Sequence, residues 1–115
     1  MVSPTVQKIA QQNDAFRRGD SSISGQRFIT SGVNELLKRL EIPPEELAQA
    51  VTDFSDFTED NDPHSEHGFG AFEFHRHECF WKIDLYNQDY SQGSDDPSDL
   101  AKTRRVLTIM LAEEW

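Results

Sequence analysis

The fold of this chain depends most on residues 71–86, which read AFEFHRHECFWKIDLY. Residues 71–74 alternate along a short strand, and in residues 79–86 every second side chain is apolar. Such alternation is typical of strands that bury one face. Residues 75–78 lie where a hairpin turn is needed. The stretch therefore predicts an antiparallel β-hairpin.

Helices are predicted on the amino-terminal side of this hairpin. Residues 4–18 carry apolar side chains at helical spacing, and Ser3 suits the N-cap position in front of Pro4. A short strand over residues 26–31 and a short helix over residues 33–40 follow. Another helix is expected to begin at Pro44. The side chains that it should bury are Leu47, Ala50, Val51, Phe54 and Phe57.

The carboxyl-terminal segment has two interpretations. Residues 87–98 have the composition of a loop. Apolar residues at helical spacing then favour a last helix that begins near Asp96 to Ser98. Residues 105–111 (RVLTIML) are rich in β-branched side chains, so a strand is the alternative. We predict the helix because good helix formers flank this stretch.

These elements predict an α+β fold. A small, mainly antiparallel sheet of about three strands should pack with three to four helices. A length of 115 residues fits one ordinary domain, and 36% hydrophobic residues are enough for one core. We therefore expect a single domain over residues 1–115.

Composition also narrows the cellular setting. No run approaches the ~18 apolar residues of a membrane span, and the amino terminus lacks the pattern of a secretory signal. Cys79 is the only cysteine, which excludes an internal disulfide framework and a cysteine-rich zinc module. We expect a cytoplasmic protein that does not enter a membrane.

Negative charge is concentrated in residues 41–75. The chain has a formal net charge of −10, and this segment contains ten acidic residues and no Lys or Arg. Residues 1–40 have a net charge of +3, and residues 76–115 have a net charge of −3. Clustered negative charge attracts basic partners and repels nucleic acid. We expect no direct binding to DNA or RNA, because phosphate binding needs Lys and Arg on one face.

This segment predicts an acidic face that runs from the Pro44 helix into the following loop. Its candidate residues are Glu45, Glu46, Asp53, Asp56, Glu59, Asp60, Asp62 and Glu66. Carboxylates spaced along a helix can imitate the phosphates of a nucleic acid and occupy a basic groove of another protein. The simpler alternative is that the face is only solvated.

The loop FTEDNDPHSEHGFG, at residues 57–70, also suggests a divalent metal site. The candidate ligands are Asp60, Asp62, His64, Glu66 and His67. Mixed oxygen and imidazole ligands suit zinc or a similar ion, and a metal-dependent hydrolase would use them. The spacing matches neither a zinc helix nor a calcium loop. The competing interpretation is a polar turn in which Asx-type hydrogen bonds satisfy the backbone and His67 packs nearby.

Other reactive side chains carry weaker signals. His75 and His77 at the hairpin tip are expected to be solvated. Cys79 could act as a nucleophile, but its surroundings are acidic, which disfavours a thiolate, so we expect it to be buried. Phosphate-binding loops and serine nucleophile elbows do not occur in the sequence.

Several motifs carry a resemblance to a known family. They are NDAFRR at 13–18, FSDFTEDNDP at 54–63, EHGFG at 66–70, WKID at 81–84 and RVLTIMLA at 105–112. From Asn13 to Trp115 the chain resembles a family of small proteobacterial proteins of unknown function, often encoded on plasmids, conjugative elements and prophages. It departs from the family pattern at Gly68, Leu85 and Asn87.

The resemblance implies a setting in mobile DNA and supplies no catalytic residues. Small acidic proteins of such elements are often inhibitors of host defence, including anti-CRISPR and anti-restriction proteins that mimic DNA. By this analogy, we expect a non-enzymatic binding protein whose partner is a basic, nucleic-acid-handling protein. The metal-dependent alternative stays open at this point, and no other cofactor is expected.

Overall fold

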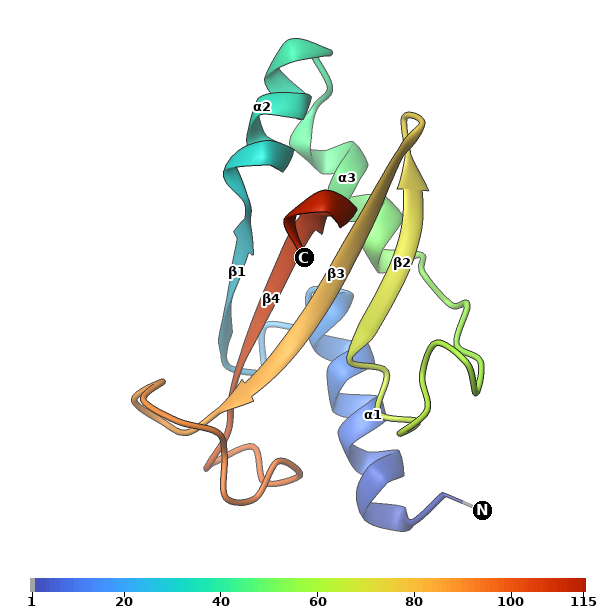
Figure 1. The fold of residues 1–115 in the computed structure, drawn as a ribbon. Helices are drawn as coiled ribbons and strands as arrows, with labels where there is room; N and C mark the ends of the chain where they lie inside the picture. The colour runs from blue at the N-terminus through green and yellow to red at the C-terminus, as the bar shows by residue number, and fades with distance from the viewer. Residues whose placement is uncertain (1) are drawn as a thin grey trace.

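The computed structural model describes residues 2–115 and shows an α+β fold (Figure 1). Its elements are α1 (Pro4–Arg17), β1 (Gly25–Ile29), α2 (Ser31–Arg39), α3 (Pro44–Thr52), β2 (Phe69–Phe74), β3 (His77–Tyr86), β4 (Arg104–Leu111) and the 3-10 helix η1 (Ala112–Glu114). The four strands form one sheet in the order β1-β4-β3-β2. β1 is parallel to β4, and the other two pairs are antiparallel. The predicted α+β class is confirmed, with one strand more than expected.

The predicted hairpin is formed by β2 and β3. Phe74 pairs with His77, so the turn contains only two residues, His75 and Arg76. Both have positive φ angles, 48° and 68°. A two-residue type I′ turn requires positive φ at both central residues, and its twist matches the right-handed twist of the two strands. The turn is therefore shorter than the four residues expected from the sequence, and β2 begins earlier, at Phe69.

The predicted last helix is wrong, and the alternative strand is correct. β4 lies in the interior of the sheet, with β1 on one side and β3 on the other. Arg105, Leu107 and Ile109 are buried in alternation, which is the period of a strand. The helix formers around this stretch are overridden because two neighbouring strands supply backbone partners. Residues 96–102, where the helix was expected to begin, form turns instead.

The predicted first and third helices are confirmed with adjusted ends. Ser3 caps α1 by accepting a hydrogen bond from the backbone N–H of Val6. α3 ends at Thr52, so Phe54 and Phe57 follow the helix instead of belonging to it. Both rings still pack against the core. Among residues 2–115, no helix is long and apolar enough to cross a membrane.

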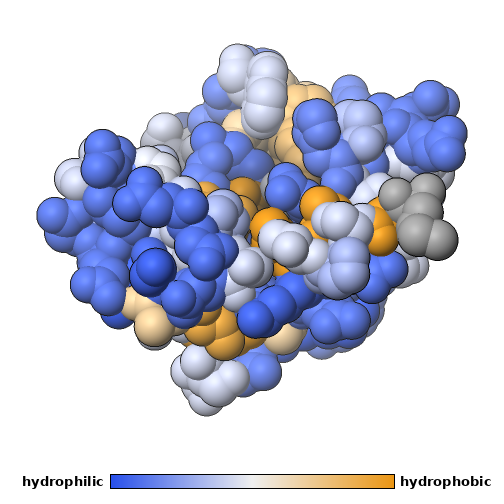
Figure 2. Space-filling model, turned by 90° about the horizontal axis from the view of Figure 1, so that it is seen from below, coloured by the Kyte–Doolittle hydropathy of each residue, from blue (hydrophilic) through white to orange (hydrophobic). Residues whose placement is uncertain are grey.

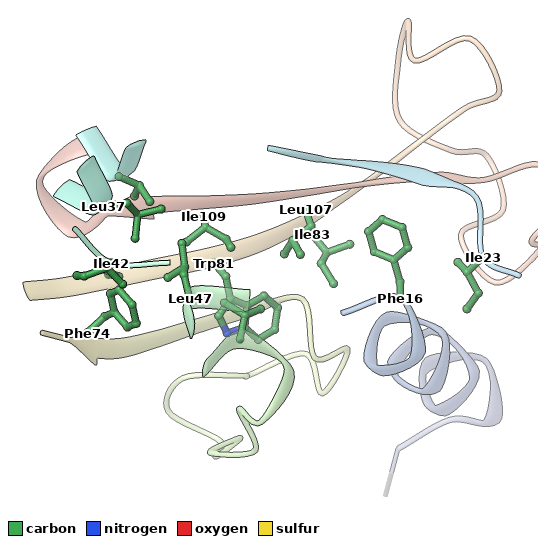
Figure 3. Close-up of a cluster of buried hydrophobic side chains, with 13 residues drawn as sticks. Phe16, Ile23, Leu37, Ile42, Leu47, Phe74, Trp81, Ile83, Leu107 and Ile109 are labelled. Carbon is green, nitrogen blue, oxygen red and sulfur yellow. The ribbon is translucent and has the colours of Figure 1, made fainter. Parts of the chain in front are cut away.

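The core lies between the sheet and the helices: α1 and α3 cover the same face of the sheet (Figure 1), and α2 adds Val33 and Leu37. Figure 3 shows Phe16 of α1 and Leu47 of α3 pointing toward Trp81 and Leu107 of the sheet. Phe16 and Trp81 are fully buried. The end of the molecule formed by the 87–103 loop and the start of α1 is mainly hydrophilic at its surface (Figure 2).

Candidate functional site

The acidic face is built on α3 and the loop that follows it. Its exposed members are Glu45, Glu46, Asp53, Asp56, Glu59 and Asp60. We use "acidic face" for these six residues from here on. Within residues 2–115 none of them forms an ion pair with Lys or Arg. No Lys or Arg of the described residues therefore offsets the negative charge of this face, and Glu46 alone has an ionisable partner, His75.

The amphipathic pattern of α3 explains how the face is presented. Leu47 and Val51 are buried against the sheet, which turns Glu45 and Asp53 outward. Glu45 and Glu46 lie in the first turn, where carboxylates interact favourably with the helix dipole. Glu46 also contacts the ring of His75 at the hairpin turn. The fold therefore fixes the helical half of the acidic face on a rigid element.

The loop after α3 is held by its own polar side chains. Oδ1 of Asn61 accepts a hydrogen bond from the backbone N–H of Thr58 at 2.7 Å, and Nδ2 of Asn61 donates to the carbonyl of Asp56 at 2.8 Å. The loop is thus a polar turn held by a side chain, as in the simpler interpretation, although Asn61 bonds the backbone before it and not the backbone two residues ahead as in an Asx turn. Glu59 and Asp60, which the turn carries, are exposed.

Two residues predicted for the acidic face lie elsewhere. The side chain of Asp62 is only 10% exposed and faces His67. Both of its carboxylate oxygens lie 3.3 Å from the backbone N–H of His67. Glu66 is partly buried, and its carbonyl accepts a hydrogen bond from Asn13. The structure thus separates Asp62 and Glu66 from the exposed carboxylates.

His67 joins the loop to α1. Its Nδ1 lies 3.0 Å from both carboxylate oxygens of Asp14, and its Nε2 lies 3.8 Å from Asp62. The ring stacks on Phe57 with a centroid distance of 3.9 Å and an interplanar angle of 2°. Both ring nitrogens face carboxylates, so the imidazole anchors the loop instead of activating a nucleophile. The expectation that His67 packs nearby is confirmed.

Arg17 completes this cluster behind Asp14. Its Nη2 donates to Asp14 at 2.9 Å, and its guanidinium lies over the ring of Trp81 at 5.2 Å. Burial lowers the pKa of Arg17 below its usual value, and the charge of Asp14 offsets part of this effect. Sequence reasoning missed Asp14 and Arg17 as partners of the loop. The only signal was that NDAFRR occurs among the motifs of the family resemblance.

The five candidate metal ligands do not come together. His64 is exposed, while His67 is turned toward α1. In the part of the chain that the structure describes, no group of three or more His, Cys, Asp or Glu side chains is arranged to hold a metal ion. The geometry therefore gives the metal-dependent alternative no support.

Cys79 has the packing role predicted for it. It is 1% exposed, and its Sγ donates to the carbonyl of His77 at 3.6 Å. Burial, and after it the negative charges of Glu114 and Glu78, raise the pKa of the thiol. A raised pKa disfavours the thiolate that a nucleophile needs. Of the two hairpin histidines expected to be solvated, His75 is exposed and His77 is partly buried.

Comparison with known proteins gives a family and no activity. The family described as "Protein of unknown function (DUF3768)" matches residues 29–114. No curated protein and no solved structure matches the chain. The matched region contains the whole acidic face and His67 but begins after α1, so Asp14 and Arg17 lie outside it. Because the match covers well over half of the sequence, the chain belongs to the DUF3768 family of proteins of unknown function.

Proposed function

We propose that this protein is a non-enzymatic binding protein whose acidic face engages a basic groove of a nucleic-acid-handling partner. The observation that carries the proposal is the set of six exposed carboxylates on α3 and its loop that have no Lys or Arg partner in the described chain. Complementary charge steers association and excludes partners of the same sign. A groove that normally binds phosphates has the required positive charge.

The form of the acidic face supports DNA mimicry as the finer proposal. Glu45, Gln49 and Asp53 follow one line along α3, and Nε2 of Gln49 donates to Asp53 at 2.8 Å, which limits the motion of that carboxylate. Carboxylates fixed on a helix and a hydrogen-bonded turn lose little freedom on binding, and this preorganisation favours affinity.

The biological setting is part of the same proposal. The family resemblance suggests a proteobacterial protein of mobile elements that acts in the cytoplasm. Within such a setting, the target would be a host nucleic-acid-binding or defence complex, and the protein would act like an anti-CRISPR or anti-restriction inhibitor. When this protein occupies the basic groove of the partner, the DNA that the partner normally binds could not enter the groove.

The test begins with affinity capture. The immobilised protein is exposed to bacterial lysate at low salt, eluted at high salt, and its partners are identified by mass spectrometry. The affinity of the purified partner is then measured for the wild type and for a charge-reversal variant, Asp53→Lys, Asp56→Lys, Glu59→Lys and Asp60→Lys.

A matched control variant changes the net charge by the same amount at four positions outside the acidic face. Glu35→Lys, Glu78→Lys, Asp95→Lys and Glu113→Lys also replace four exposed carboxylates. We expect the first variant to lose binding and the control to keep most of it. DNA should compete with the wild type, and affinity should fall with salt because exposed charges are screened over about 8 Å at physiological ionic strength. Equal losses in both variants, or no loss in the first, would contradict the proposal.

A further inference from the structure

A cavity of about 480 Å³ opens between the carboxyl end of α1, the edge strand β1 and the helices α2 and α3. Its lining is mainly apolar. It combines the exposed side chains of Phe28 and Ile29 with core side chains that show little surface, namely Leu37, Leu47, Val51, Leu107 and Ile109. Leu37, Leu47, Leu107 and Ile109 belong to the core cluster drawn in Figure 3. Pockets that bind small molecules measure about 300–1,000 Å³ and are largely apolar with a few polar groups. The cavity has this size and this character.

Three arginines also line the cavity, Arg17, Arg18 and Arg27. Arg18 and Arg27 are exposed, and within residues 2–115 neither forms an ion pair with a carboxylate. Arg27 is nonetheless held in place. Its Nη2 donates to the carbonyl of Phe16 at 2.7 Å, and its guanidinium lies 4.1 Å from the centre of the Phe16 ring. A protein with a net charge of −10 therefore keeps two unpaired guanidinium groups beside its apolar cavity.

Arg17, the third of these arginines, is buried and belongs to the cluster with Asp14 and Trp81. The residue is 3% exposed, and its Nε is buried with no hydrogen-bond partner in the described structure. Its Nη1 reaches the carbonyls of Val51 and Thr52 only at 3.4 and 3.5 Å. Its side chain is closed to solvent and its Nη2 is already paired with Asp14 at 2.9 Å. A ligand in the cavity would therefore meet the exposed guanidinium groups of Arg18 and Arg27.

We propose that this cavity binds a small amphipathic carboxylate, with the aliphatic part among the apolar side chains and the carboxylate at Arg18 and Arg27. Guanidinium groups recognise carboxylates through charge-assisted hydrogen bonds. A simple inorganic anion would leave the apolar lining unfilled, and a cation would be repelled by the arginines. The site is distinct from the acidic face, because Leu47, Ala48 and Val51 of α3 line the cavity whereas Glu45 and Asp53 are not among its lining residues.

The test uses defined probes on the full chain. Octanoate is titrated into isotopically labelled protein, and chemical shifts of backbone amides and methyl groups are followed by NMR. Octylamine has the same tail with the opposite charge, and acetate has the same head without the tail. We expect octanoate to shift the methyl signals of Leu37, Leu47, Val51 and Leu107, and to bind at least about tenfold more tightly than either control probe.

Two variants test separately how the cavity binds the carboxylate and the aliphatic chain of octanoate. Arg18→Gln removes an exposed guanidinium that makes no hydrogen bond in the described chain, and we expect it to weaken octanoate binding about threefold to tenfold. Ala48→Phe adds a ring at an exposed helical position that lines the cavity, and we expect it to abolish binding. Arg39→Gln, at an exposed arginine of α2 outside the cavity lining, is the matched control and should leave binding unchanged.

Three results would overturn the proposal. The first is the absence of octanoate binding at millimolar concentration. The second is equal binding of octanoate and octylamine, and the third is equal loss in Arg18→Gln and Arg39→Gln. Unchanged amide spectra of the variants without ligand would show that they are folded, so a loss of binding could be assigned to the cavity.

Discussion

The buried guanidinium of Arg105 on β4 donates through Nε to Oδ1 of Asn13 on α1 at 2.7 Å. Its Nη2 donates to Gln12 at 3.0 Å, and Arg105 is 0% exposed. No carboxylate of residues 2–115 forms an ion pair with it. Burial lowers the pKa of Arg105 to about 10. Neutral amides thus hold a buried positive charge and fix α1 against the sheet.

Asn13→Ala should destabilise the protein by about 2–4 kcal/mol, because it leaves a buried charged donor without its acceptor. The free energy of unfolding is measured by urea denaturation. Gln11→Ala, at an exposed position of the same helix, is the control and should change stability by less than about 0.5 kcal/mol. A double-mutant cycle with Arg105→Met should give a coupling energy of about 1–3 kcal/mol. Similar costs for Asn13→Ala and Gln11→Ala would contradict this role.

Gly70 on β2 should not tolerate a side chain. A Cβ atom there would meet Nε1 of Trp81 across the strand pair and would lie 2.8 Å from a ring carbon of Phe54. Overpacking of this kind costs about 1–3 kcal/mol, so Gly70→Ala should lower the urea midpoint and alter the tryptophan fluorescence. Gly93→Ala is the control, since its Cβ would find its nearest neighbour at 3.9 Å. Equal stability of the two variants would refute the close packing.

The sequence was sufficient for elements whose signals are local. α1 was predicted from its cap and spacing, and the β2–β3 hairpin was predicted from its alternation. β4 was predicted as a helix because its correct assignment depends on β1, a strand about 80 residues earlier that pairs with it. Helix propensity is a weak guide in the interior of a sheet, where neighbouring strands decide the structure.

The candidate site was predicted in the same uneven way. The exposed part of the acidic face follows from the amphipathic pattern of α3, which is visible in the sequence. The direction of the Asp62 side chain, toward His67, could not be predicted from the sequence. It depends on the position of His67, which Asp14 of α1 fixes. The separation of Asp14 and His67 is 53 residues, and no spacing rule connects two positions so far apart.

Glu114 should make stability depend on acid pH. Desolvation opposes its ionisation, but hydrogen bonds from Thr30, Leu111 and Gly32 outweigh it, and the pKa is lowered. A carboxylate with a lowered folded pKa stabilises the protein above its unfolded pKa, near 4.5, and loses that contribution as pH falls through the folded value. The side chain is exposed, so the effect should stay below about 1 kcal/mol.

The measurement compares Glu114→Gln with the wild type by urea denaturation at several pH values. We expect the variant to be less stable at neutral pH and the difference to shrink below about pH 4.5. Glu113→Gln, the exposed neighbour, should follow the wild type at every pH. A difference that grows as pH falls would have the wrong sign for this explanation.

His67 should determine how firmly the loop after α3 is held. His67→Ala removes the contact with Asp14 at 3.0 Å and the stacking on Phe57, and it should cost about 1–3 kcal/mol of stability. Amide hydrogen exchange should accelerate in residues 58–68 more than in the sheet, because the loop would open locally. His64→Ala is the matched control, because His64 is exposed in the same loop. Equal exchange in the two variants would show that Asp62 and Asn61 hold the loop without the imidazole. Faster exchange in His67→Ala alone would mean that α1 positions the loop half of the acidic face, although α1 lies outside the matched family region.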